Sequence, residues 1–404
     1  CDSKYKLLKY VVAALVRYWL IHSDYWQTLS NRVEIATPLN SWKRLVEGIY
    51  LFEHNIDPYD GDSFHESPLL LISFYSLLKY APYLLPGVFT LIDILTAYFL
   101  YKTAKIFVRI LKSNQEKNIE VISDESKAMM LTNLQLEEVP EYVLSVYLFN
   151  PYSVLNCVGM TTTVVQNLLL AVSLWGSVAG HRLVACIFIA LATHQALYPI
   201  TLIVPISILL ADVNKGCKKC SYIRTLLFFY NKTYFGISTI ILYFFRLNVP
   251  DLKPNIGLFW YFFTEMFEHF RLLFVCAFQI NALILYVVPL TLRFKNEPVL
   301  LATVLIALST IFRSYPCVGD VGFYLALLPM WKHLFTLLGP TVWHLWIYSG
   351  SANANFFFGV TLSFATAQIF LITDLMFAYL KREFTLKHGS SRQVDGKPAK
   401  LVLR

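Results

Sequence analysis

Charged residues are scarce in this sequence. They make up 15% of its 404 residues, whereas soluble domains contain roughly 25%. This composition excludes a disordered chain, which combines low hydrophobicity with high charge, and it excludes a nucleic-acid-binding protein. The net charge of +8 does not change that conclusion, because the basic residues form short clusters beside apolar runs, where they set the orientation of a membrane protein.

The sequence also lacks the signs of a disulfide framework, a metal centre or a catalytic nucleophile. Most of its seven cysteines lie in apolar runs, where a thiol behaves as a small hydrophobe. The single CxxC motif, Cys217 to Cys220, has no second pair and no nearby histidine, which favours a lysine-rich loop over a metal site. Neither Cys157 nor Cys317 has a base that is evident from the sequence. We therefore expect no catalytic residue, no metal and no cofactor.

Long apolar runs are what the sequence has instead. Hydrophobic residues make up 56% of it, and a membrane-spanning helix needs about 20 mainly apolar residues. Runs near or above that length are Leu84 to Leu100, Val139 to Val158, Phe228 to Phe245, Val299 to Phe312 and Phe356 to Leu380. We predict an all-α polytopic membrane protein with about 10–12 transmembrane helices, in which residues 1–404 form a single multispanning domain.

Basic clusters predict which side of the membrane each loop occupies. Three lysines precede most of the first apolar run, Leu7 to Ile21, and the positive-inside rule then places the N-terminus in the cytoplasm. No small-residue cleavage site follows the run, so we expect a first transmembrane helix and not a signal peptide. Residues 24–80 then form a lumenal loop, residues 113–138 a cytoplasmic loop, and residues 381–404 a cytoplasmic tail.

Two helices are expected in the lumenal loop. Ser41 to Gly48 has an amphipathic pattern, with Ser41 as the N-cap and Gly48 just after the helix. Pro68 to Tyr80 is apolar but too short to cross, so we expect it to lie in the membrane interface.

Helix breaks are predicted in the middle of the chain. Val139 to Val178 should form two spans with a turn at Gly159 to Thr161. Leu183 to Leu210 should form a hairpin of short helices that is broken at Tyr198-Pro199 and at Pro205.

The densest patch of acids lies in the lumenal loop, at residues 57–68. Asp60 and Asp62 form a DxD pattern, and such acids can bind a metal or act as a general base. The neighbouring proline, glycine and serine residues equally describe a turn in which an aspartate bonds its own backbone. We favour the turn.

Ionisable residues inside apolar runs are costly and usually have a partner or a function. Asp93 and Asp374 are two of them. Glu265, Glu268 and His269 have the spacing of one helical face and could ligate a metal. No second histidine stands near them, so we favour an ion-paired or interfacial cluster.

Trp343 to Asn355 joins an aromatic belt to small residues and two amides, Asn353 and Asn355, at the predicted lumenal edge. Amides both donate and accept hydrogen bonds, which suits sugar hydroxyls and phosphate esters. Equally, Asn355 could N-cap the last helix while the tryptophans anchor it. The basic cluster around Lys219 also has two interpretations, contact with acidic lipid headgroups or topology alone.

Several blocks between about Arg32 and Arg382 are long and unusual in composition. They are Ser41 to Gly48, Phe64 to Leu69, Leu191 to Pro199, Pro254 to Phe263, Met266 to Phe270 and Trp343 to Asn355. By these blocks the sequence resembles the phosphatidylinositol-glycan class U subunit of the GPI transamidase. The chain is shorter than that family's pattern before Asn248 and between Lys332 and Trp343. The topology requires a crossing in the second region, so the number of helices there stays open.

The resemblance implies a multi-pass subunit of the endoplasmic reticulum membrane, with a fold similar to the GT-C glycosyltransferases. Such a subunit is not an enzyme. It recognises the GPI lipid and positions it for attachment to the C-terminus of precursor proteins, while a partner, a caspase-like cysteine protease subunit, performs the chemistry. By position, Asn353, Asn355 and Lys295 would bind the GPI glycolipid, and Lys219 would bind an anionic phospholipid such as cardiolipin. The predicted topology places Lys295 in the cytoplasm, which conflicts with contact to a lumenal glycan.

Two other functions stay open. One is an endoplasmic reticulum mannosyltransferase of the GT-C type that acts in GPI or glycan assembly, with Asp60 or Asp62 as its base. Such enzymes generally keep acids close to the first span, where this chain offers only Asp24. The other is a transporter that uses Asp93 and Asp374, although no internal repeat supports it.

Overall fold

The computed structural model describes residues 2–60, 63–117, 133–213, 247, 252–329, 354–388, 393–394 and 397–398. In this part the regular secondary structure is helical, apart from one antiparallel pair, β1 (Gln393–Val394) and β2 (Lys397–Pro398). Gln393 pairs with Pro398, and Val394 pairs with Lys397. The predicted all-helical class is therefore confirmed.

The helices of the described part agree with several predicted boundaries. In chain order they are α1 (Asp2–Ile21), α2 (Tyr25–Ser30), α3 (Trp42–Glu53), α4 (Pro68–Tyr80), η1 (Pro82–Leu84), α5 (Leu85–Lys117), α6 (Asn133–Phe149), α7 (Pro151–Val158), α8 (Thr163–Ala179), α9 (Arg182–Gln195), η3 (Tyr198–Leu202), α10 (Ile203–Val213), α13 (Phe259–Glu265), α14 (Glu268–Ile280), η4 (Asn281–Leu285, a π-helix), α15 (Val287–Phe294), α16 (Pro298–Phe312), α17 (Val318–Ala326) and α19 (Ala354–His388). α4 coincides with the predicted interfacial helix, the turn at Gly159 to Thr161 separates α7 from α8, and the break near Tyr198 separates α9 from α10.

Three helical stretches of the described part are long and apolar enough to cross a membrane. They are Pro82–Ser113, Glu268–Phe294 and Thr361–Thr385. The described part also holds shorter apolar helices of 10–17 residues, namely Pro68–Tyr80, Thr163–Ala179, Arg182–Gln195, Tyr198–Ala211 and Pro298–Phe312. α1 is 20 residues long but is not among the candidate spans, because several basic residues interrupt it. The total of about 10–12 crossings stays a prediction.

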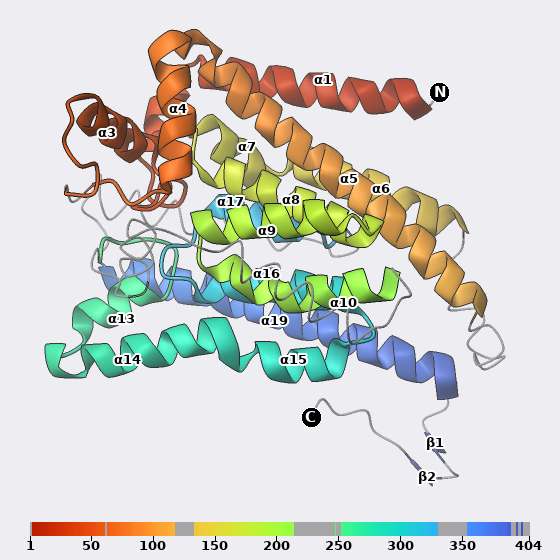
Figure 1. The fold of residues 1–404 in the computed structure, drawn as a ribbon. Helices are drawn as coiled ribbons and strands as arrows, with labels where there is room; N and C mark the ends of the chain where they lie inside the picture. Colours follow the sequence, from red (N-terminus) through yellow and green to blue (C-terminus); the bar gives the residue numbers. More distant parts are fainter. Residues whose placement is uncertain are drawn as a thin grey trace.

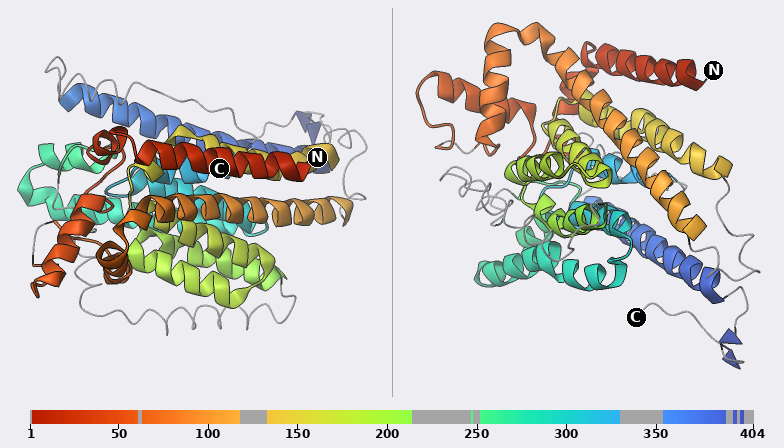
Figure 2. Two further views of the ribbon diagram at one scale, coloured as in Figure 1. Left: turned by 90° about the horizontal axis from the view of Figure 1, so that it is seen from above. Right: turned by 45° about the vertical axis from the view of Figure 1, so that its right-hand side comes forward.

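The long helices run from one end of the molecule to the other (Figure 1). The N-terminus and the C-terminal ends of α5 and α19 lie at the end drawn on the right, whereas α3, α4 and α13 lie at the end drawn on the left. By the predicted topology the first is the cytoplasmic end and the second the lumenal end, and we use both names in this sense. Seen from above (Figure 2, left), α5 lies between α1 and the yellow-green helices of residues 163–213.

The main hydrophobic core lies where α5, α6, α8, α9, α16 and α17 pack together. Leu100, Tyr147 and Tyr324 are fully buried in it. A glycine allows the closest approach of two helices there. A Cβ atom at Gly176 of α8 would lie 2.9 Å from the backbone nitrogen of Ala185 on α9, so α8 and α9 are in backbone contact.

A second core holds the lumenal helices α3 and α4 against the start of α5. Trp42 of α3 meets the rings of Phe74 and Phe89 edge-on, with centroid distances of 5.3 and 5.4 Å. The rings of Phe74 and Phe89 stack on each other at 5.5 Å. Aromatic pairs in such geometries add about 0.5–1.5 kcal/mol each beyond burial, so this cluster fixes α3 and α4 on α5.

The end of α3 differs from the prediction. The helix continues to Glu53, so Gly48 lies inside it and not after it. Ser41 stands at the N-cap position but makes no capping hydrogen bond with its side chain. The glycine allows the helix to pass the fully buried ring of Phe64, because a Cβ atom at Gly48 would lie 2.6 Å from Phe64 Cγ. Close packing, and not helix termination, therefore explains this glycine.

We expect Gly48→Ala to destabilise the fold by about 1–3 kcal/mol, because an added methyl group overpacks a buried ring. Gly87→Ala is the matched control. Gly87 also lies in a helix, but nothing stands within 4 Å of its Cβ position, so this change should be neutral or stabilise by up to about 1 kcal/mol. Heating the purified protein in detergent, followed by size-exclusion chromatography, measures the thermal unfolding midpoint of each variant. Equal midpoints would contradict the packing argument.

The predicted span Val139 to Val158 is not one continuous helix. The side chain of Asn150 accepts a hydrogen bond from Tyr152 N–H (3.0 Å) and so caps α7, which begins at Pro151. An N-cap followed by proline is a helix-start signal, which the prediction overlooked. The predicted break at Pro205 is also wrong, because Pro205 stands in the first turn of α10, where its missing N–H is tolerated.

The acidic face predicted around Glu265 does not form. α13 ends at Glu265, Met266 and Phe267 are extended, and α14 begins at Glu268. The interruption means that Glu265, Glu268 and His269 do not share one helical face, so this prediction is wrong. Across the ranges that the structure describes, no group of three or more His, Cys, Asp or Glu residues is placed to hold a metal ion.

Candidate functional site at the lumenal end

Thr162, the residue just before α8, joins three distant segments at the lumenal end. Its hydroxyl donates to Glu66 Oε1 (2.5 Å), its carbonyl accepts from Gln195 Nε2 (2.9 Å), and its N–H donates to the carbonyl of Asn40 (3.0 Å). All four residues are buried. Glu66 and Gln195 belong to two of the blocks that carry the family resemblance, so the structure brings these blocks together.

A closed set of hydrogen bonds lies beside it, around Tyr198. The Tyr198 hydroxyl donates to Gln279 Oε1 (3.2 Å), Gln279 Nε2 donates to Ser314 Oγ (3.0 Å), and Ser314 N–H donates back to the Tyr198 hydroxyl (3.0 Å). Each of the three residues is buried. The set links η3, α14 and the turn between α16 and α17, so three separate elements are held in register.

The block Pro254 to Phe263 packs against the same turn. Asn255 Oδ1 accepts a hydrogen bond from Gly257 N–H (2.7 Å), which closes a tight turn. A Cβ atom at Gly257 would lie 2.7 Å from Pro316 Cδ, so the glycine is needed for this close approach. A third block therefore meets the others at the lumenal end.

The turn between α16 and α17 carries a buried ion pair. Arg313 Nη1 lies 2.5 Å from Asp320 Oδ1, and the guanidinium lies over the ring of Tyr198 at 5.7 Å. Asp320 Oδ2 accepts from the N–H of Cys317 (3.1 Å) and so caps α17. Asp320 therefore stabilises both the ion pair and the start of the helix.

The Cys317 thiol is held in its protonated form. Burial raises its pKa from 9.0 to about 12, and the negative charge of Asp320 contributes in the same direction. The sulfur lies 3.3 Å from Asp320 Oδ2 and 3.5 Å from Thr163 Oγ1. Because the thiolate is the nucleophilic form, Cys317 serves here as a hydrogen-bonding group at the start of α17.

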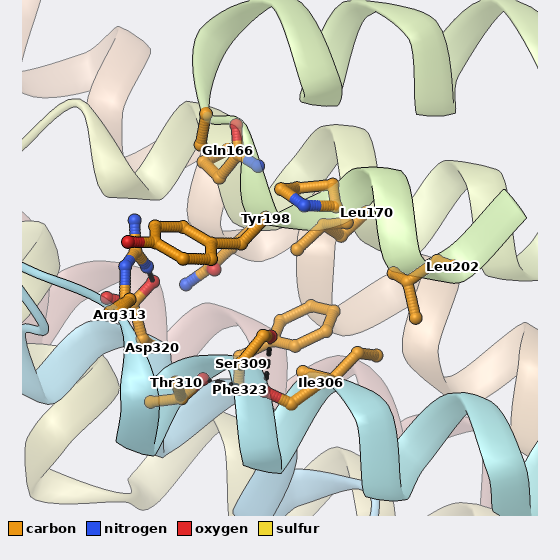
Figure 3. Close-up of a pocket in the computed structure, with 13 residues that line it drawn as sticks. Gln166, Leu170, Tyr198, Leu202, Ile306, Ser309, Thr310, Arg313, Asp320 and Phe323 are labelled. Carbon is orange, nitrogen blue, oxygen red and sulfur yellow. Dashed lines mark hydrogen bonds and ion pairs between the residues drawn. The ribbon is translucent and has the colours of Figure 1, made fainter. Parts of the chain in front are cut away.

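Two small cavities adjoin the ion pair. Their volumes are about 30 and 20 Å³, and they share Gln166, Ala196, Arg313 and Asp320. Figure 3 shows Tyr198, Arg313 and Asp320 together at one side of the larger cavity. A water molecule needs about 10–15 Å³ of such volume, so each cavity has room for one or two waters and not for a sugar. This polar centre organises the segments around it.

The acidic patch in the lumenal loop forms a turn. Asp57 Oδ1 accepts from Tyr59 N–H (2.9 Å), and Asp60 N–H donates to the carbonyl of Asp57 (3.1 Å). This confirms the predicted turn in which an aspartate bonds its own backbone. Asp60 is exposed, and Asp62 lies outside the described residues.

Asp93 of α5 has its partner inside the chain. Arg17 Nε of α1 lies 2.6 Å from Asp93 Oδ2, and both side chains are fully buried. Tyr147 of α6 donates its hydroxyl to Asp93 Oδ1 (2.8 Å), and Arg17 Nη1 donates to the carbonyl of Leu148 (2.9 Å). The acid therefore ties three helices together. Asp374, in contrast, is exposed on α19.

Two of the four predicted lipid contacts can be located. Asn353 and Lys219 lie outside the described residues. Asn355 stands in the first turn of α19, at the lumenal end. Lys295 is exposed directly after α15.

A large distance separates Lys295 from Asn355. Phe294, the residue before Lys295, meets the ring of Tyr379 on α19 at 6.0 Å. Tyr379 follows Asn355 by 24 residues on one helix, which corresponds to about 36 Å at 1.5 Å per residue. The structure therefore does not bring Lys295 and Asn355 to one site, and Lys295 stands at the end of the molecule that the topology predicted for it.

The start of α19 packs on the aromatic residues of α13. Phe358, one turn after Asn355, stacks on Tyr261 with ring centroids 4.3 Å apart and an interplanar angle of 17°. It also meets the edge of Trp260 at 6.3 Å. Trp260 and Tyr261 belong to the block Pro254 to Phe263, so α19 meets another of the resemblance blocks one turn after Asn355.

Sequence reasoning did not single out Arg17, Thr162, Arg313 or Asp320. Arg17 had a signal, since it is a charge in the middle of the first apolar run. Asp320 had a weaker one, as an acid three residues after the N-cap residue Cys317, where its side chain can bond the backbone of that residue. Thr162 and Arg313 have no local signal, because their roles depend on segments far away in the sequence.

Comparison with known proteins identifies the family. The model of the family described as GPI transamidase subunit PIG-U matches residues 11–364. The chain is 40% identical over 437 residues to the GPI-anchor transamidase component PIGU of Homo sapiens, an alignment that covers 98% of this chain and 99% of that protein. It is 29% identical over 427 residues to the GPI transamidase component GAB1 homolog of Schizosaccharomyces pombe, with 97% and 98% covered. The chain therefore belongs to the PIG-U family, whose members are non-catalytic components of the GPI transamidase.

Proposed function

We propose that this chain recognises the GPI lipid at its lumenal end and positions it for attachment to the C-terminus of precursor proteins. It does so in the endoplasmic reticulum membrane, in a complex with the other transamidase subunits. A caspase-like cysteine protease subunit makes and breaks the bonds. A fold similar to the GT-C glycosyltransferases, and contact of Lys219 with an anionic phospholipid, are parts of the same proposal.

The position of the first turn of α19 is the observation that carries this proposal. The turn contains Asn355 and lies at the lumenal end, where a GPI glycan is accessible. A helix N-terminus presents unpaired N–H groups and a positive dipole end, which favour a phosphate ester. The preceding amide of Asn353 adds donors and acceptors suited to sugar hydroxyls.

The aromatic residues beside this turn support the same role. Trp260 and Tyr261 of α13 pack on Phe358 of α19, so the turn is anchored by a rigid aromatic cluster. Tryptophan and tyrosine are enriched at the level of lipid headgroups. A substrate held there by a fixed helix end approaches the acyl-enzyme of a neighbouring subunit in one orientation, which converts a two-body encounter into an oriented one.

Replacing both amides tests the proposal. Asn353→Ala with Asn355→Ala removes two hydrogen-bonding groups worth about 1 kcal/mol each, so we expect GPI affinity to fall about 30-fold and surface GPI-anchored protein to drop several-fold. Flow cytometry measures the surface level, and co-purification measures assembly of the complex, which should not change. Unchanged anchoring in a well-assembled variant would count against the proposal.

Asn296→Ala is the matched control, because Asn296 is an exposed asparagine at the cytoplasmic end. It should leave anchoring at the level of the unmodified chain. Lys295→Ala belongs in the same assay, since Lys295 is the remaining predicted GPI contact. A loss as large as that of the amide pair would show contact at both ends of the molecule, and an unchanged level would remove Lys295 from the site.

A further inference from the structure

A larger cavity than the two beside the ion pair lies between α5 and α8, toward the cytoplasmic end. Its volume is about 450 Å³, which falls within the usual range of about 300–1,000 Å³ for ligand pockets. We call it the basic pocket. Its chemistry comes from six lining residues: Tyr98, Lys102, Lys105 and Arg109 on α5, Trp175 on α8, and His181 after the α8 C-terminus.

The cations of the basic pocket follow one face of α5. Tyr98, Lys102, Lys105 and Arg109 are separated by four, three and four residues, the spacing that places side chains on the same side of a helix. Like charges at these spacings repel one another. Among the described residues none of the three cations has a carboxylate partner, so an anion is the missing complement of this face.

The other walls of the pocket are aromatic. Trp175 lies 5.3 Å from the ring of Phe99 on one side and 5.3 Å from the ring of His181 on the other. Lys102 Nζ lies 5.3 Å from the ring of Tyr98, so its position is fixed by a cation–π contact. The pocket thus combines a row of cations with a largely aromatic wall, as a site for an amphipathic anion requires.

The location of the pocket decides between a lipid and a soluble anion. All the α5 residues that line it lie within the candidate membrane span Pro82–Ser113, in its second half. An occupant there is in contact with the membrane interface. Basic pockets between helices on the cytoplasmic side bind acidic lipid headgroups.

We infer that the basic pocket binds the phosphate of an anionic phospholipid of the cytoplasmic leaflet, with the headgroup between Lys102, Lys105 and Arg109. This site is separate from the GPI site, which is at the opposite end. Every lining residue that the structure describes belongs to α5, to α8 or to the residues just after α8, whereas Lys219 lies outside the described residues. The inference does not depend on the proposed function.

Retention of phosphatidylserine tests the inference. The complex is reconstituted in phosphatidylcholine nanodiscs with 20 mol% phosphatidylserine, extracted in a neutral detergent and washed, and the retained phosphatidylserine is counted by mass spectrometry. Each basic residue near an acidic lipid strengthens binding about fivefold. Lys105→Gln with Arg109→Gln should therefore weaken binding about 30-fold and remove about one phosphatidylserine molecule per chain. Both side chains are exposed and unpaired in the described part, so the variant should fold.

Arg293→Gln with Lys381→Gln is the matched control, because it removes two exposed cations from the same end of the molecule. It should retain as much phosphatidylserine as the unmodified complex. An equal loss from both variants would mean that surface charge alone attracts the lipid and would overturn the inference. Full retention of phosphatidylserine by Lys105→Gln with Arg109→Gln would also overturn the inference.

Two further arms separate a lipid from a free phosphate and guard against misfolding. Glycerophosphoserine, the headgroup without acyl chains, should not displace phosphatidylserine at equal concentration, and complete displacement would overturn the assignment to a lipid. A phosphatidylserine with a photoreactive headgroup should label residues 98–109 or 175–181 of the unmodified chain. Labelling only elsewhere in the chain would overturn the inference without any variant.

Discussion

Asp93→Asn is expected to lower the free energy of unfolding by about 3–5 kcal/mol. Asp93 and Arg17 are both fully buried, with Arg17 Nε 2.6 Å from the carboxylate. An arginine side chain does not lose its proton inside a protein. The variant therefore leaves a positive charge in the core without its counter-charge, in a region where water cannot compensate.

The reverse change should cost less. In Arg17→Met the remaining aspartate can take up a proton and become neutral, and it keeps its hydrogen bond with the Tyr147 hydroxyl. The double variant Arg17→Met with Asp93→Leu removes both charges and fills the space with apolar groups. Replacing a buried ion pair in this way is often neutral or stabilising. The unfolding midpoint of the double variant should therefore be close to that of the unmodified chain and well above that of Asp93→Asn.

A double-mutant cycle in neutral detergent measures this coupling. Thermal unfolding midpoints of the unmodified chain, the two single variants and the double variant are compared under one condition. Arg17→Lys is a useful fifth member, because a lysine keeps the charge but lacks the planar fork that also reaches the Leu148 carbonyl. Additive effects of the two single changes would contradict the buried pair.

The same pair shows how far sequence reasoning can reach. A carboxylate inside an apolar run predicts a partner, and the structure supplies one for Asp93. The identity of that partner could not be predicted, because Arg17 is 76 residues away in the chain and lies in an apolar run that itself predicts a membrane span. Because the carboxylate of Asp93 is paired with Arg17 of the same chain, Asp93 gives no support to the transporter alternative.

Helix positions were predicted well where the apolar pattern alone determines them. α4 has the predicted bounds, and α5 covers the predicted apolar run Leu84 to Leu100 from Leu85 onward. The prediction was wrong where packing determines the local structure. Gly48 is inside α3 because of the ring of Phe64, and the extended residues at Met266 interrupt a spacing that looked helical.

The lumenal site was predictable only in part. The blocks around Glu66 and Gln195 stood out by composition, but nothing in the sequence indicated that Thr162 joins them. The contacts assigned by resemblance have a similar limit. The resemblance assigns Asn355 and Lys295 to one ligand, the predicted topology already conflicts with that assignment, and the structure places Lys295 next to Phe294, whose ring meets Tyr379 far along α19 from Asn355.

Removal of the Asp320 carboxylate is expected to have the other large effect. In Asp320→Ala the chain loses the partner of Arg313 and also the acceptor that caps α17 at Cys317. Loss of a buried pair costs about 3–5 kcal/mol, and loss of a helix cap adds about 1 kcal/mol. We expect the free energy of unfolding to fall by about 4–6 kcal/mol.

Asp320→Asn separates these two contributions. Its amide oxygen can still accept from the N–H of Cys317, so the cap is kept while the charge is lost. Its unfolding midpoint should therefore lie above that of Asp320→Ala and below that of the unmodified chain. Adding Arg313→Met to Asp320→Asn should recover most of the remaining loss, because neither charge is then buried.

The ion pair is also expected to be insensitive to salt. Arg313 and Asp320 have side-chain exposures of only 17% and 8%, and buried charges are screened much less than surface charges. The difference in midpoint between Asp320→Asn and the unmodified chain should thus be nearly the same at about 0.05 and 0.5 M salt. A difference that vanishes at high salt would place the pair at the surface. In that case the polar centre between α8, η3 and α17 would depend on the hydrogen bonds of Thr162 and Tyr198 and not on Arg313.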